Sequence, residues 1–145
     1  MLTVRLSADV KPTENEDKVR RALLNVCPSA RIEASHDESG VTILRGQAEG
    51  PEVLSNLAKK LRDQRILEAV RQVFLKCIER GTLVFGIHRQ AALVNRFHLC
   101  NLDDISAMGP IRVEISADNL ADVVDYLTPP TVRGKPQFRQ DLKLR

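Results

Sequence analysis

The chain lacks the short motifs on which most catalytic and cofactor sites are built. Its seven glycines never form the GxGxxG pattern of dinucleotide-binding loops, and Gly134-Lys135-Pro136 is not a phosphate-binding lysine motif. It has no GxxG either, which excludes the clamp of KH domains. No serine or cysteine stands near a histidine in a nucleophile motif. We therefore expect a protein without enzymatic activity and without a cofactor.

Cysteines and long apolar runs are also scarce. The three cysteines are scattered, which argues against a disulfide framework. No apolar run approaches the roughly 20 residues that cross a bilayer, and the first residues do not have the pattern of a secretory signal. These features predict a cytoplasmic protein with no membrane role. The 145 residues suit one domain, which we place at 1–130, followed by a basic extension at 131–145.

Only five residues are aromatic, and this limits the ways in which the chain can bind nucleic acid. Single-strand binders commonly stack bases on aromatic side chains of a sheet. Of the five aromatics, only Phe85 and Phe97 fall in predicted strands, and both are expected to be buried. Any RNA binding would therefore depend on the backbone and the shape of the RNA.

The charge is distributed in blocks that the net value of +3 conceals. Residues 59–96 hold nine Lys and Arg against three Asp and Glu, whereas residues 97–132 hold one against six. Residues 1–58 are slightly acidic, with seven against nine, and residues 133–145 are basic, with five against one. Such blocks either bind an anionic partner or pair with each other within or between chains.

Hydrophobic periodicity predicts about six strands and three or four helices. Alternation of apolar and polar residues indicates strands at 2–10, 30–34, 41–48, 82–88, 93–100 and 111–116. A capping box of Thr13 and Glu16 begins a helix that ends at Pro28, and Asp118 or Asn119 caps a helix over 120–127. Because several strands follow one another directly, we predict a mostly antiparallel α+β fold.

Residues 51–80 have helical potential with a shift in the apolar face. One stripe ends at Leu61 and another begins at Ile66, with neither Gly nor Pro between them. This predicts either two helices that meet near Asp63 or one long helix, ended by Gly81 in a left-handed cap.

Two pairs of residues, one of aspartates and one of histidines, are candidates for a catalytic or metal site. Asp103 and Asp104, with His88 and His98, would serve a carboxylate- or metal-dependent enzyme only if all four converged. Loop or cap roles are the simpler interpretation, and no metal is expected.

The basic helix is the other candidate site. Its cations are suited to contacting phosphates in a salt-sensitive and sequence-tolerant way. The predicted RNA-binding residues are Arg62, Arg65, Arg71, Lys59 and Lys60. A solvated helix face with a few ion pairs is the alternative.

Four stretches along the chain carry a resemblance to a known family. They are VKPTE (10–14), LRDQRILEA (61–69), RQAA (89–92) and GPIRVEI (109–115). On them the chain resembles a small archaeal family whose members are labelled RNA-binding proteins. The resemblance implies an α+β fold similar to the large-subunit ribosomal protein that binds 5S ribosomal RNA, and a homodimer. The acidic segment 97–132 is a departure, because it would repel RNA wherever it shared a face with the basic helix.

Two functions therefore remain open. The first is a non-enzymatic RNA-associated protein that uses the basic surface of 59–96. The second is a homodimeric structural or protein-interaction module without nucleic acid, in which the basic helix or tail docks on the acidic 97–132 segment.

Overall fold

The computed structural model describes residues 2–11, 15–36, 38, 41–62, 67–94, 96, 98–100, 110–128, 131–132 and 135–136. The strands of its main sheet are β1 (Thr3–Val10), β2 (Arg31–His36), β3 (Thr42–Glu49), β4 (Ile78–Glu79), β5 (Thr82–His88), β6 (Leu99–Cys100) and β7 (Pro110–Ser116). The helices are α1 (Glu16–Val26), α2 (Ser55–Arg62), α3 (Leu67–Lys76), α4 (Arg89–Leu93) and α5 (Leu120–Leu127), with a 3-10 turn η1 (Pro51–Leu54) before α2.

The seven strands form one open sheet in the order β2-β3-β1-β7-β5-β4, with β6 paired to β5. Every pairing is antiparallel, which confirms the predicted α+β class. The two central strands, β1 and β7, come from opposite ends of the fold in sequence, and Leu6 lies opposite Val113. A short pair of strands, β8 (Thr131–Val132) and β9 (Lys135–Pro136), forms a separate sheet within the predicted extension.

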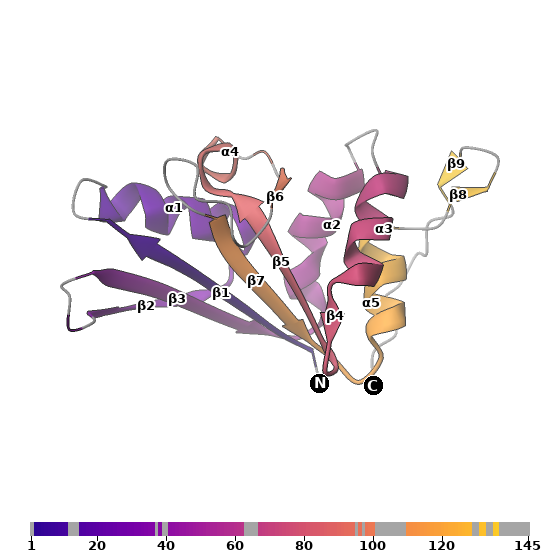
Figure 1. Cartoon of the computed structure of the whole chain (residues 1–145), viewed down its shortest axis with the longest axis horizontal. Helices are drawn as coiled ribbons and strands as arrows, with labels where there is room; N and C mark the ends of the chain where they lie inside the picture. Colours follow the sequence, from indigo (N-terminus) through magenta and orange to yellow (C-terminus); the bar gives the residue numbers. More distant parts are fainter. Residues whose placement is uncertain are drawn as a thin grey trace.

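The core lies between one face of the sheet and the helices. Alternate residues of β1 are buried, as a period of two requires, and the side chains of Leu6 on β1 and Val113 on β7 are almost fully enclosed. Figure 1 shows α1 and α4 near one end of the strands and α2, α3 and α5 near the other. The residues between the buried ones are exposed or half-buried, so the other face of the sheet is open.

The N-cap of the first helix lies two residues later than the predicted capping box placed it. Asn15 is the N-cap, and its Oδ1 accepts hydrogen bonds from the amides of Asp17 at 2.9 Å and Lys18 at 3.3 Å. An asparagine oxygen satisfies free helix amides as well as a threonine hydroxyl does. Thr13 lies outside the described residues. Asn119 caps α5, as one of the two predicted alternatives.

The long segment forms two helices, α2 and α3, and the prediction that helical structure extends to residue 80 is wrong. α3 ends at Lys76, and Ile78 begins the edge strand β4. Gly81 has a φ of +77° and Arg80 a φ of 51°, and both lie in the turn between β4 and β5. Gly81 therefore makes a tight hairpin turn rather than a helix cap, since glycine adopts this backbone region without a steric penalty.

The predicted strand over 93–100 is also wrong in most of its length. Residues 89–93 form α4, and of the described residues between 93 and 100 only Leu99 and Cys100 pair as a strand. The His88 side chain caps α4 by accepting from the amide of Ala91 at 3.4 Å. Packing against α1 supports the short helix, because the side-chain amide of Asn25 donates to the Ala92 carbonyl oxygen at 2.8 Å.

Candidate nucleic-acid interface

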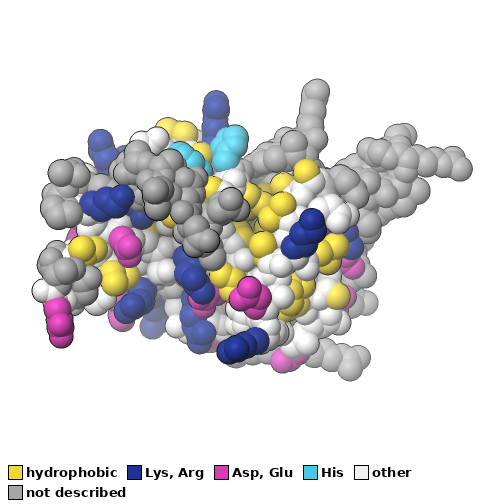
Figure 2. Space-filling view, viewed as in Figure 1, with side chains coloured by type: hydrophobic (Ala, Val, Ile, Leu, Met, Phe, Trp, Pro, Cys, Tyr) yellow, Lys and Arg dark blue, Asp and Glu magenta, His cyan; other side chains and the backbone are white. Residues whose placement is uncertain are grey.

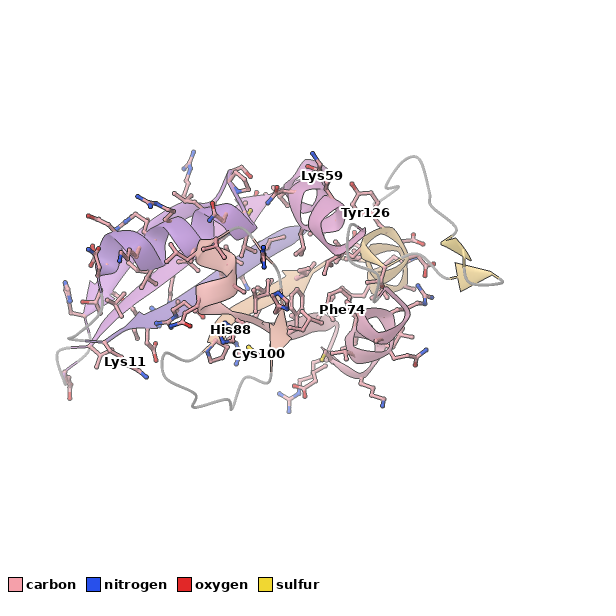
Figure 3. All side chains as sticks on the ribbon, turned by 90° about the horizontal axis from the view of Figure 1, so that it is seen from above. Lys11, Lys59, Phe74, His88, Cys100 and Tyr126 are labelled. Carbon is pink, nitrogen blue, oxygen red and sulfur yellow. The ribbon has the colours of Figure 1, made fainter. Side chains whose placement is uncertain are left out.

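The predicted basic helix surface is only partly within the described residues. Arg65 lies outside them, as do the side chains of Lys60 and Arg62, whose backbones belong to α2. Lys59 is exposed on α2. Figure 3 places it on the opposite side of the molecule from His88 and Cys100, which mark the sheet. The site formed by these residues therefore stays a prediction.

Arg71 makes internal contacts. Its Nη1 lies 2.7 Å from Oδ1 of Asp125 on α5 and donates to the carbonyl oxygen of Thr128 at 2.9 Å. The side chains of Arg71 and Asp125 are only 19% and 23% exposed, so water screens this ion pair less than a surface pair. Within the described residues, this is one case in which the basic and acidic charge blocks pair with each other in a single chain. Arg71 thus joins α3 to the end of α5.

The predicted metal- or carboxylate-dependent site gains no support from the described residues. Asp103 and Asp104 lie outside the described part of the chain. Among the residues that the structure describes, no group of three or more His, Cys, Asp and Glu is placed to hold a metal ion. His88 caps α4, and His98 contributes its carbonyl oxygen to a hydrogen bond with the amide of His88 at 2.7 Å.

Two cysteines have environments that suppress nucleophilic chemistry. Burial raises the pKa of the Cys27 thiol above its ordinary value. Partial burial, and then the negative charge of Glu79, raise the pKa of Cys77. The thiolate is the reactive form of cysteine, and a raised pKa leaves less of it near neutral pH. Both residues are therefore suited to packing rather than to covalent chemistry.

The open face of the sheet carries most of its charge on alternating strand positions. β1 exposes Arg5, and β3 exposes Arg45, Gln47 and Glu49, while the residues between them are buried. Figure 2 shows basic and acidic side chains interspersed over the strands of this face, without a large area of one sign. Positive charge is therefore concentrated only in small areas of this face, where arginines of neighbouring strands lie close together.

Four adjacent strands, β2, β3, β1 and β7, each place one exposed arginine on this face. We call these residues the arginine band: Arg31, Arg45, Arg5 and Arg112. Arg31 and Arg5 lie in one row across the sheet, because each is directly opposite Gln47 of β3. Residues directly opposite each other have Cβ atoms about 4.5–5.5 Å apart.

The other two arginines lie in the next row along the strands. Arg45 and Arg112 are both directly opposite Ser7 of β1. The band therefore crosses the sheet in a zigzag, with one arginine on each strand. Three spacings of about 4.8 Å between neighbouring strands give it a width of about 14 Å.

The arginine band borders a hollow of about 900 Å³ on the open face. All four arginines line it, together with residues of β1, β2, β3 and β7 such as Ser7 and Gln47. Three glutamates, Glu33, Glu49 and Glu114, also line the hollow, so its formal charge is close to balanced. A polar hollow of this kind suits a ligand that is bound by hydrogen bonds and charge rather than by apolar contact.

Most of the arginine band is free of internal partners. Nε of Arg112 bonds to Oε1 of Glu114 at 2.7 Å. Arg5, Arg31 and Arg45 make no ion pair or side-chain hydrogen bond with any described residue. Their guanidinium groups keep all their donors for a ligand, in contrast to Arg71.

Sequence reasoning did not identify this face as a site. The alternation in β1 and β7 already placed Arg5 and Arg112 on the polar side of their strands. Residues 1–58, however, are slightly acidic as a whole, so the charge count did not indicate that the arginines of this segment form a basic site. The strand order that brings β2, β3, β1 and β7 side by side depends on long-range pairing, which the alternation within each strand does not reveal.

Among the described residues, no helix has the length and apolar composition needed to cross a membrane.

Comparison with known proteins places the chain in a defined group. A family model described as "RNA binding" matches residues 3–117. A protein of Aeropyrum pernix named "UPF0201 protein" is 36% identical over 139 residues, which cover 94% of this chain and 91% of the relative. A protein of the same name from Metallosphaera sedula is 33% identical over 138 residues, covering 94% of both chains.

A solved structure agrees with the fold. The crystal structure of a UPF0201 protein from Methanococcus jannaschii superposes with a TM-score of 0.80 at 30% identity. The match covers 93% of this chain and 98% of that one. The predicted similarity to the ribosomal protein that binds 5S ribosomal RNA stays a prediction.

Proposed function

The chain belongs to the archaeal UPF0201 family and to the family described as "RNA binding", and from this we propose that it binds RNA through the arginine band, without catalysing a reaction. The observation that carries the proposal is the placement of one exposed arginine on each of four adjacent strands, in a hollow. Arginine forms strong, bidentate hydrogen bonds to phosphate oxygens.

The composition of the open face favours the RNA backbone as the contacted part. No Phe, Tyr or Trp occurs among the described residues of β1, β2, β3 and β7. The imidazole of His36 at the end of β2 is the one ring that these described strands offer for stacking of a base. Arginine, serine and glutamine side chains instead provide donors for phosphate and sugar oxygens. This supports recognition of backbone and shape.

Fluorescence anisotropy with a structured RNA over a salt series tests the proposal. We expect the double variant Arg5→Gln/Arg45→Gln to bind more weakly. The slope of log K against log salt should become shallower by about 1.4–1.8, because each lost phosphate contact changes it by about 0.7–0.9. Lys18→Gln/Arg21→Gln is the matched control, since both residues are exposed on α1 and their replacement also removes two positive charges.

A second variant separates the two candidate surfaces. Lys59→Gln/Arg62→Gln/Arg65→Gln removes charge from the predicted basic helix and leaves the arginine band intact. If this triple variant loses RNA affinity while Arg5→Gln/Arg45→Gln retains it, the helix is the binding surface and the proposed site is wrong. If the wild-type chain does not bind at low salt, the RNA-binding function itself is excluded.

Self-association is the alternative function that an observation favours. Three large apolar side chains on α3 and β4 are at least 36% exposed: Val73, Leu75 and Ile78. Exposed apolar groups of this kind are common in contacts between chains. Measuring the molar mass by light scattering, for the wild-type chain and for Val73→Ser/Leu75→Ser, tests this alternative. A monomer at every protein concentration would exclude the predicted homodimer.

A further inference from the structure

Ser7 is the residue at which three members of the arginine band converge. Arg45 of β3 and Arg112 of β7 lie directly opposite it on its two sides. Arg5 precedes it by two positions on the same strand and the same face, about 7 Å away. An arginine side chain is long enough to reach over each of these separations. The Ser7 hydroxyl therefore lies within reach of three arginine side chains.

The side chains around Ser7 have hydrogen-bond donors that no described residue uses. Arg5 and Arg45 are exposed and make no side-chain hydrogen bond with a described residue. Arg112 uses its Nε for Glu114, so both of its terminal amino groups remain. Ser7 is half-buried, and its hydroxyl makes no hydrogen bond with any described residue. An oxyanion placed over Ser7 meets one hydroxyl and three guanidinium groups.

The groups around Ser7 carry a net positive charge, as the lining of the hollow does. The fourth neighbour of Ser7 on this face is Asp9, two positions further along β1 and exposed. Glu114 lies directly opposite Arg5 and is bonded to Arg112. Three arginines against Asp9 and Glu114 give a formal charge of +1 around a neutral hydroxyl. Glu33, which lies opposite Arg45 on its far side, then limits the positive region towards the sheet edge. A net positive charge therefore favours an anion at Ser7.

We propose that Ser7, Arg5, Arg45 and Arg112 form a binding site for a single phosphate group. The guanidinium groups donate to the non-bridging oxygens, and the Ser7 hydroxyl donates a further hydrogen bond from below. The natural ligand rests on the proposed function and is a phosphodiester of the RNA backbone. The same chemistry accepts a free phosphate, so the two ligand sources need separate experiments.

The test is a titration of the full-length, 15N-labelled protein with inorganic phosphate, followed by NMR. Chloride at matched ionic strength is the reference. We expect saturable shifts of the Ser7 amide and of the arginine Nε signals of Arg5, Arg45 and Arg112. Ser7→Asp should abolish these shifts, because its carboxylate occupies the position of the phosphate. Ser35→Asp adds the same charge to the open face at a position diagonal to Arg45 but remote from Ser7, Arg5 and Arg112, and it should retain the shifts of those three residues.

A variant with the opposite expectation guards against a folding defect. Asp9→Asn should tighten phosphate binding about fivefold, because it removes a repelling charge at a solvated position. A loss of stability cannot produce tighter binding. Unchanged affinity of both Asp9→Asn and Ser7→Asp would overturn the site.

The RNA arm uses an unstructured uridine oligonucleotide and an RNA duplex against the same signals. Displacement of phosphate by either RNA supports a backbone phosphodiester as the ligand. If phosphate shifts Ser7 but neither RNA binds, the site stands as one for a free phosphate and the proposed function fails. If RNA binds with full affinity to Ser7→Asp, the function stands and the phosphate site is wrong.

Discussion

The two faces of the sheet are built from alternate residues of the same strands, but they have opposite chemistry. On β1, Leu6 is buried against the helices, whereas its neighbours Arg5 and Ser7 lie on the open face. The covered face has apolar side chains throughout β1 and β7. The comparison teaches that, under the proposed function, one strand separates stability from binding at the level of single residues. Neighbouring substitutions should therefore affect different properties.

The largest expected effect comes from the covered face. Leu6→Ala should lower the free energy of unfolding by about 2–5 kcal/mol, because it removes buried methyl groups and leaves a cavity. Its side chain is 2% exposed in the native structure. Urea denaturation followed by circular dichroism measures the change. RNA affinity per folded molecule should be unchanged, and a loss of affinity in the folded state would break the separation of the two faces.

Gly86→Ala tests how closely β6 packs against β5 at the edge of the open face. A Cβ atom at Gly86 would lie 2.7 Å from the backbone oxygen of Cys100 on β6, so the strand pair has to move apart. We expect a loss of about 1–3 kcal/mol in unfolding free energy, typical of overpacked sites. Gly46→Ala is the control, because its nearest contacts are side-chain atoms at 3.4 Å. Equal unfolding free energies of Gly86→Ala and the wild type would show that β6 can move away from β5 without loss of stability.

Arg71→Gln should produce a smaller change. It removes a hydrogen bond and an ion pair that are partly exposed, and we expect a loss of about 1–2 kcal/mol. A double-mutant cycle with Asp125→Asn measures the coupling between α3 and α5. Unaltered RNA binding would confirm a structural role for Arg71. A clear loss of RNA affinity with unchanged stability would show instead that Arg71 belongs to the RNA-binding surface, as the sequence predicted.

The smallest expected effect on stability belongs to the arginine band. Arg45→Gln should change the free energy of unfolding by less than about 0.5 kcal/mol, since its side chain is exposed and makes no internal ion pair among the described residues. Thermal unfolding of Arg45→Gln beside Leu6→Ala gives the direct comparison of the two faces. A destabilisation as large as that of Leu6→Ala would mean that the open face is structural.

Local pattern predicted much of this fold. The alternation in residues 2–10 and 111–116 gave strands on the right segments, and the stop at Pro28 gave the end of α1. Helical structure was predicted to continue to residue 80, but the chain turns after Lys76 into β4, because the tight turn at Gly81 allows β4 to pair back on β5. Tertiary pairing overrode helical potential at that point.

The candidate site was harder to predict for a physical reason. Arg5 and Arg112 are 107 positions apart in sequence, and they meet only because β1 pairs with β7. Sequence pattern shows which side of a strand a residue faces, but not which strand lies beside it. The basic helix was conspicuous because its charges are contiguous, whereas the charges of the arginine band are contiguous only in space.

The pairing of β1 with β7 also governs how the chain acquires its shape. The first strand to be synthesised must wait for residues 110–116 before its second edge is covered. Contacts between segments so distant in sequence close late and slow folding, since the loop entropy is lost before they form. During translation, β1, β2 and β3 can associate early, while one edge of β1 stays open. An open edge is a template for pairing with other chains, so the interval between the synthesis of β3 and that of β7 leaves such a template exposed on β1.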